Sequence, residues 1–143
     1  MTVTYSDDVL ATMKLARVIR PELSSHISRI SFHELGESFV CNSEQDSELL
    51  LVDAMNGAVV KTVCCKASGV RHPTMTHHRD CTLFASDSNR GNSDIYYHSF
   101  HDNTILAKFT GHRPVLIDSL SMNPVADTFL SSGRDGVRLW SLT

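Results

Sequence analysis

The sequence contains no long hydrophobic run. Its longest purely aliphatic stretch covers residues 49–52, far short of the roughly 20 apolar residues that a membrane-spanning helix needs. The first 20 residues place Asp7 and Asp8 where a signal peptide would carry positive charge, and they have no apolar run that ends in small residues. We therefore expect neither a transmembrane segment nor secretion.

Neither acidic nor basic residues are in large excess. The chain has 13 basic and 16 acidic residues, a formal net charge of −3, so no broad field would attract it to phosphate backbones or anionic membranes. The basic residues near the N-terminus are dispersed, which is typical of a solvated surface. Direct binding to nucleic acid or membrane is not expected.

Catalytic and metal-binding motifs are also lacking. Without a secretory signal, the four cysteines (Cys41, Cys64, Cys65 and Cys81) indicate reduced intracellular thiols. Three of these cysteines lie in a cluster with histidines, which comprises Cys64, Cys65, His72, His77, His78 and Cys81. The cluster has zinc-ligand atom types but no CxxC pair or HxxxH helix, and adjacent histidines point to opposite faces of a strand. The chain also has no GxSxG elbow and no glycine-rich phosphate loop, so we expect no catalytic residue, metal or cofactor, and a His/Cys metalloenzyme is the minor alternative.

What the sequence does contain is a repeat of short apolar runs separated by turn residues. With 143 residues, 41% hydrophobic and 20% charged, the composition suits one globular domain, and the pattern predicts mostly β structure. Phe39, Phe84 and Phe129 lie 45 residues apart in similar contexts. This spacing falls within the period of about 40–45 residues of four-stranded propeller blades.

The repeat predicts three units and their strands. A blade is expected over 24–65, a second over 66–110, and a third over 111–143 that lacks its outer strand. Residues 10–18 form an orphan apolar stretch, either a strand or a short helix, with nothing local to pair with. Besides the segments around the three phenylalanines, strands are expected at 49–52, 59–64, 95–100, 105–109 and 137–140, with turns at 44–46, 89–92 and 134–136.

The third unit carries a distinctive set of residues. Gly111-His112 is followed 23 residues later by Asp135, and Trp140 lies five residues beyond that. This spacing resembles a WD repeat. In such repeats a histidine, a hydroxyl, an aspartate and the tryptophan form a buried hydrogen-bond chain, and the resemblance assigns this structural tetrad to His112, Ser131, Asp135 and Trp140.

The role implied for these four residues is structural, because a buried indole N–H or imidazole needs a partner. A catalytic triad of His112, Ser131 and Asp135 is not favoured, since a triad needs an exposed nucleophile. The first two units have Val52-Asp53 and His98-Ser99 where a Trp-Asp pair would stand. Their tetrads are therefore expected to be incomplete.

Three further segments are similar to one subfamily, the Swd-two family of WD-repeat proteins shared by the COMPASS histone methyltransferase complex and the protein phosphatase 1–PNUTS complex. They are 16–20 (ARVIR), 99–103 (SFHDN) and 120–129 (LSMNPVADTF). Family members are closed rings of about seven blades, so the resemblance covers only the N-terminal part of such a protein. It implies an incomplete, open, all-β propeller in which 10–18 would be the closing strand.

The function implied by this resemblance is that of a non-enzymatic nuclear scaffold. Its partners would be a COMPASS methyltransferase subunit, the PNUTS phosphatase-targeting subunit and RNA polymerase II, in chromatin modification and transcription. A generic WD-repeat adaptor of another assembly is the alternative. Open blade edges also predict self-association of the chain.

Overall fold

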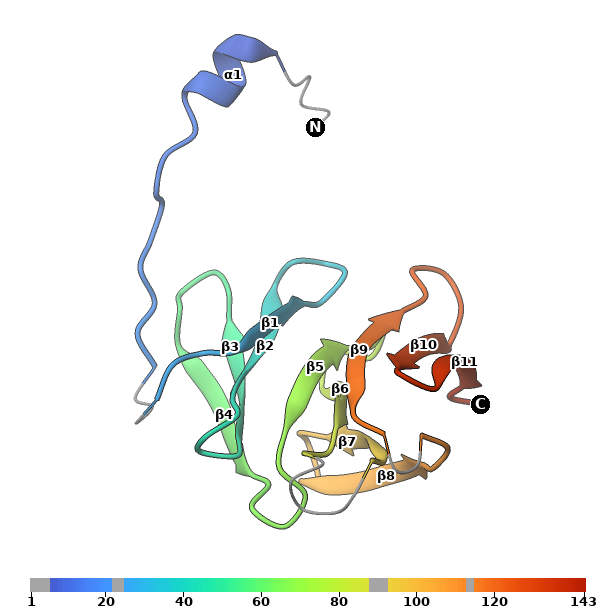
Figure 1. Cartoon of the computed structure of the whole chain (residues 1–143). Coiled ribbons are helices and arrows are strands. Elements are labelled where there is room, and N and C mark those ends of the chain that lie inside the picture. The colour runs from blue at the N-terminus through green and yellow to red at the C-terminus, as the bar shows by residue number, and fades with distance from the viewer. Residues whose placement is uncertain (1–5, 22–24, 88–92, 113–114) are drawn as a thin grey trace.

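The computed structural model describes residues 6–21, 25–87, 93–112 and 115–143, which form one short helix and eleven strands. The strands make three antiparallel sheets (Figure 1). The first sheet contains β1 (Arg29–Phe32), β2 (Ser38–Ser43), β3 (Glu48–Asp53) and β4 (Val59–Cys64). The second contains β5 (Arg71–Met75), β6 (Cys81–Ala85), β7 (Ile95–Ser99) and β8 (Thr104–Phe109), and the third contains β9 (Ile117–Met122), β10 (Thr128–Gly133) and β11 (Gly136–Ser141).

Each sheet is a meander, and the three sheets stand side by side as blades of an arc (Figure 1). The first strands of the blades contact one another: β5 contacts β1 and β2, and β9 contacts β5 and β6. The blades therefore radiate from an inner wall built of β1, β5 and β9. The mostly-β expectation is confirmed, and the described residues form an open arc of three blades and no closed ring.

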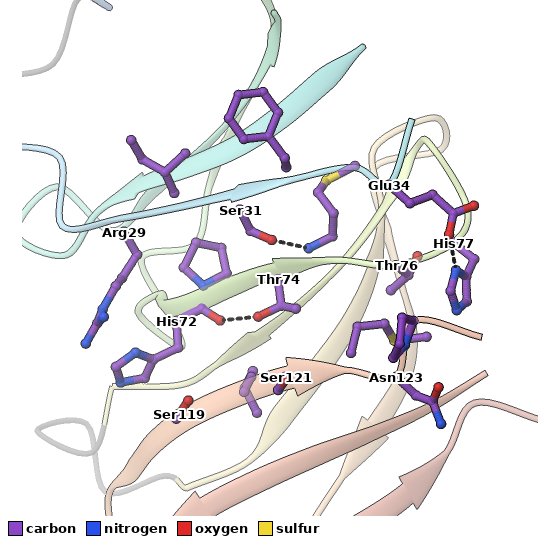
Figure 2. Close-up of a pocket in the computed structure, with 17 residues that line it drawn as sticks. Arg29, Ser31, Glu34, His72, Thr74, Thr76, His77, Ser119, Ser121 and Asn123 are labelled. Carbon is purple, nitrogen blue, oxygen red and sulfur yellow. Dashed lines mark hydrogen bonds and ion pairs between the residues drawn. The ribbon is translucent and has the colours of Figure 1, made fainter. Parts of the chain in front are cut away.

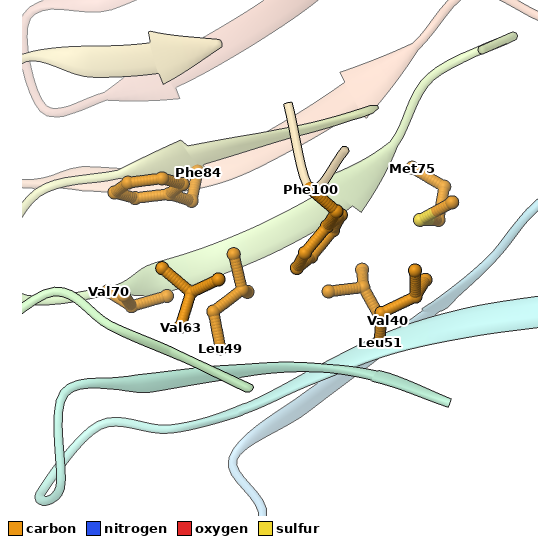
Figure 3. Packing of buried hydrophobic residues seen from close by; sticks show 8 residues of the cluster. All are labelled: Val40, Leu49, Leu51, Val63, Val70, Met75, Phe84 and Phe100. Atoms are coloured by element: carbon orange, nitrogen blue, oxygen red, sulfur yellow. The ribbon is translucent and has the colours of Figure 1, made fainter. Parts of the chain in front are cut away.

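Apolar side chains fill the space between adjacent blades. One cluster joins blades 1 and 2 (Figure 3), and its buried members are Val40, Leu49, Leu51, Val63, Val70, Met75, Phe84 and Phe100. A second cluster joins blades 2 and 3 through Leu83, Ala85, Ile95, Ile117, Leu120 and Phe129. Because side chains alternate along a strand, each blade contributes one set of residues to the blade before it and another to the blade after it.

The expected strands agree closely with those observed. β4 has the expected bounds, β8 and β11 contain the expected strands 105–109 and 137–140, and each repeated phenylalanine lies on the second strand of its blade. The expected turn at 89–92 lies outside the described residues. The inner strands β1, β5 and β9 were not individually identified from the sequence.

The N-terminal segment is helical at its start and irregular after it. Its first part is α1 (Asp7–Ala11), whose N-cap Ser6 accepts a hydrogen bond from the backbone of Val9. The following N-terminal arm (residues 12–21) has no regular secondary structure. The helix before it stands apart from the blades (Figure 1), whereas Arg17 of the arm donates a 3.1 Å hydrogen bond to the backbone carbonyl of Met55 in blade 1. Residues 10–18 form no strand in this structure: residues 10 and 11 end α1, and residues 12–18 have no regular secondary structure. With five residues, α1 is the one helix of the described chain, and it is too short to cross a bilayer.

Candidate functional site

A chain of polar side chains crosses the third blade. Trp140 Nε1 donates to Ser131 Oγ at 2.7 Å, and the same hydroxyl lies 2.7 Å from His112 Nε2. The other imidazole nitrogen, Nδ1, lies 2.6 Å from Asp135 Oδ1. The structure therefore brings together all four residues assigned to the tetrad.

The Asp135 carboxylate at the end of this hydrogen-bond chain indicates the direction of the hydrogen bonds. The hydrogen bonds from His112 and Arg138 hold the pKa of the Asp135 carboxyl below its usual range, so the group is an ionised acceptor. In the tautomer that carries its proton on Nδ1, His112 donates to Asp135, and its Nε2 accepts the Ser131 hydroxyl proton; Arg138 Nη1 also lies 2.7 Å from Nδ1. The order of donation runs from Trp140 through Ser131 and His112 to Asp135.

Packing around the tetrad leaves no room for a reacting molecule. The His112 and Ser131 residues are 0% and 1% exposed. The Trp140 ring is half-buried against Phe129, with ring centroids 6.2 Å apart. A Cβ on Gly111 would lie 2.7 Å from the Trp140 ring, so this position must be glycine for the indole to fit. The Ser131 hydroxyl is thus enclosed, whereas a nucleophile must be accessible to its substrate.

Within the described residues, the first two blades hold no chain that runs through a histidine and a tryptophan, although Asp46 of blade 1 accepts hydrogen bonds from the hydroxyls of Ser25 and Ser43 at 3.0 and 2.8 Å. Asp53 instead accepts hydrogen bonds from the backbone of Met55 and Asn56 at 2.8 and 3.1 Å, and so closes the turn after β3. His98 packs edge-on against Phe100 with ring centroids 5.4 Å apart. Burial lowers the pKa of His98, which keeps its imidazole neutral.

The inner wall of the arc holds a hollow of about 430 Å³ (Figure 2). All three blades line it, through β1, β5 and β9 and the turns that follow them. Its polar residues include Arg29, Ser31, His72, Thr74, Ser119 and Ser121. The sequence did not predict this surface, because each inner strand has only four to six residues of mixed polarity and carries no recognised motif.

Side-chain contacts join blades 1 and 2 at the edge of this hollow. His77 Nδ1 lies 2.7 Å from Glu34 Oε2, and Ser31 Oγ accepts a 3.1 Å hydrogen bond from the backbone of Met75 (Figure 2). The Glu34 carboxylate raises the pKa of His77, and backbone carbonyl groups of blade 3 at Ala126 and Asn123 act in the same direction. His77 therefore lies where all three blades meet.

The cysteine and histidine cluster is distributed over several elements. Cys64 ends β4, His72 lies in β5 and Cys81 begins β6, whereas His77 and His78 lie in the turn after β5 and not in a strand. Across the described ranges, no three His, Cys, Asp or Glu side chains are grouped to hold a metal ion. Burial raises the pKa of Cys41 and of Cys65 to about 11, so both thiols are protonated at neutral pH.

The chain is similar over almost its whole length to curated WD-repeat proteins. It is 35% identical over 143 residues to WD repeat-containing protein 82 of Drosophila melanogaster. The aligned residues cover 99% of this chain and 44% of that relative. It is 31% identical over 144 residues to COMPASS component SWD2 of Saccharomyces cerevisiae. This alignment covers 99% of this chain and 43% of that relative. The chain thus spans less than half the length of these relatives. No protein-family model matches the sequence.

A solved structure has the same fold. The crystal structure of RRP9 WD40 repeats superposes with a TM-score of 0.68 over 86% of this chain and 36% of that one, at 17% identity. At this identity the likeness concerns the fold alone, and it confirms the WD-repeat architecture expected from the third blade. The chain is therefore a three-bladed, incomplete WD-repeat propeller, homologous over almost all of its length to the SWD2 and WD repeat-containing protein 82 group.

Proposed function

We propose that this chain is a non-catalytic interaction module that acts as a WD-repeat subunit of a nuclear chromatin-modifying complex. The observation that carries the proposal is similarity over 99% of the chain to proteins named as a COMPASS component and a Set1 complex component. The internal chemistry agrees with this role, because His112 and Ser131 are buried and the Ser131 hydroxyl is bonded to Trp140. Enzymatic activity would then belong to other subunits.

The surface proposed for partner binding is the hollow of the inner wall. It is open, all three blades contribute to it, and it mixes serine and threonine hydroxyls with the charged side chain of Arg29. Such a surface offers donors and acceptors to a protein segment while the blades hold it in one geometry. Ser119 and Ser121 lie on the blade 3 side of this hollow, and both are exposed.

The specific partners proposed are a SET-domain methyltransferase subunit of COMPASS, the PNUTS phosphatase-targeting subunit and RNA polymerase II. The first is supported by the names of two relatives. The other two follow only from the resemblance to the Swd-two family. A role in transcription and its termination, and a location in the nucleus, are parts of the same proposal.

Purification of the tagged chain from nuclear extract tests the proposal. Quantitative mass spectrometry should recover methyltransferase-complex subunits, phosphatase-complex subunits or both above a mock purification. Replacing Ser121→Arg should lower that recovery at least about fivefold, whereas Ser141→Arg, on the exposed strand β11 and outside the hollow, should not. Recovery of a different assembly would indicate the generic adaptor, and equal recovery by both variants would remove the hollow from the proposal.

The proposed structural units are blade 1 over 24–65, blade 2 over 66–110 and blade 3 over 111–143. Within them the tetrad of His112, Ser131, Asp135 and Trp140 is proposed to hold blade 3 in shape. We also propose that residues 10–18 become a strand where a sheet edge is supplied to them. Backbone pairing of this arm would give protection from hydrogen exchange at residues 13–18, which the isolated arm lacks.

A further inference from the structure

The 45-residue repeat gives each blade an equivalent position that faces the following blade. Val40, Ala85 and Leu130 occupy it, each on the second strand of its blade. Val40 and Ala85 are 0% exposed because blades 2 and 3 cover them, but Leu130 is 44% exposed. The exposure of these equivalent positions thus depends on whether a following blade packs against them.

The cross-strand partners of these residues show the same contrast. Leu51 pairs with Val40 and Ile95 pairs with Ala85, and both partners are buried. Leu139 pairs with Leu130 and is 70% exposed. We call the apolar surface formed by Leu130, Leu139 and the neighbouring Val137 the trailing face.

Blade 1, at the opposite end of the arc, carries the residues that in blades 2 and 3 pack against the preceding blade. Phe84 and Phe129 each pack toward the preceding blade, in the two clusters between blades. Phe39 occupies the equivalent position in blade 1, where the described chain has no preceding blade. Beside it Ile30 and Phe32 are 59% and 60% exposed, and we call these three residues the leading face.

The leading face is also hollowed. An apolar cavity of about 230 Å³ lies over it, lined by Ile30, Phe32 and Phe39 and by Ile19 of the N-terminal arm. Ile19 packs on one edge of the face and leaves the two exposed side chains uncovered. The face therefore has room for apolar side chains from another molecule.

We propose that two copies of this 143-residue chain associate head to tail, with the trailing face of one copy packed on the leading face of the other. A second copy is the fitting occupant because each chain carries both halves of a contact that it already makes twice internally. The two faces lie at opposite ends of the arc (Figure 1), so the contact is heterologous. Two copies supply six blades, which is within the range of 4–8 that propellers use.

Sedimentation of the purified chain over a dilution series tests this association. The weight-average mass should exceed that of the 15.9 kDa chain at high concentration and fall toward it on dilution. Leu139→Asp on the trailing face and Ile30→Asp on the leading face should each weaken self-association at least about tenfold. The matched control is Leu106→Asp, because Leu106 is 51% exposed on the outer strand of the middle blade and lies on neither face.

Mixing the two variants separates lost contacts from lost folding. The Leu139→Asp chain keeps an intact leading face and the Ile30→Asp chain keeps an intact trailing face, so together they should form a 1:1 dimer through one native contact. A monomer at every concentration, an equal effect of Leu106→Asp, or no dimer in the mixture would each overturn the proposal. None of these results depends on which nuclear complex the chain joins.

Discussion

The indole nitrogen of Trp140 and the hydroxyl of Ser131 form a 2.7 Å hydrogen bond between the third and second strands of blade 3. The bond runs diagonally across the strand pair, since Trp140 is opposite Phe129 and Ser131 is opposite Arg138. The Ser131 hydroxyl also contacts the buried imidazole of His112. One hydroxyl group thus serves two otherwise unpaired nitrogen atoms.

Removing that hydroxyl should destabilise the chain without affecting any reaction. Ser131→Ala leaves the indole N–H and His112 Nε2 without their partner, which should lower the free energy of unfolding by about 1–3 kcal/mol. Urea denaturation followed by tryptophan fluorescence measures the change. Ser121→Ala is the matched control, since Ser121 is exposed in the hollow and should change stability by less than about 0.5 kcal/mol. Equal effects of the two variants would contradict the buried role of Ser131.

The contribution of Asp135 should depend on pH in one direction. Its pKa is lowered in the folded chain by hydrogen bonds from His112 and Arg138, so its stabilisation is present above the ordinary carboxyl pKa of about 3.9. This stabilisation is lost as the pH falls through the lower, folded-state pKa. The stability gap between the wild-type chain and Asp135→Asn should therefore be greatest above about pH 5 and close in acid. A gap independent of pH would show that the carboxylate charge is not involved.

The ion pair between blades 1 and 2 should show the opposite pH dependence. Glu34 raises the pKa of His77, so this stabilisation is complete below the ordinary histidine pKa of about 6.5 and is lost as the pH rises through the folded-state value. Glu34→Gln should return the His77 pKa toward the ordinary value in an NMR titration. It should also destabilise the chain at pH 5 more than at pH 9. Because Glu34 is half-exposed, the effect on stability should be small.

Two glycines should respond differently to the same substitution. Gly111→Ala places a Cβ 2.7 Å from the Trp140 ring, so the indole must move and its fluorescence should shift. Gly36→Ala meets no atom within 4 Å, but its φ of +72° costs an alanine about 1–2 kcal/mol. Its tryptophan emission should stay that of the wild type. An unchanged spectrum for Gly111→Ala would mean that the Trp140 ring does not fill that space.

The sequence alone was sufficient for features that depend on local pattern. The 45-residue spacing of Phe39, Phe84 and Phe129 predicted three repeated units, because each blade must bury the same side chain against its neighbour. The bounds of β4 followed from an apolar run between turn residues. The partners of Trp140 could be named because a WD repeat holds them at a set spacing, although only the structure measures their contacts.

Only the tertiary structure identified the inner wall and the two end faces. β1, β5 and β9 all line the hollow, and β5 and β9 show no simple apolar alternation that would have identified them. The contact between His77 and Glu34 spans 43 residues and exists because two blades pack side by side. Leu130 resembles Val40 and Ala85 in the sequence, and whether such a residue is buried depends on whether another blade covers it. Sequence patterns set the strands within a blade, whereas the position of a residue in the arc decides which surfaces remain open.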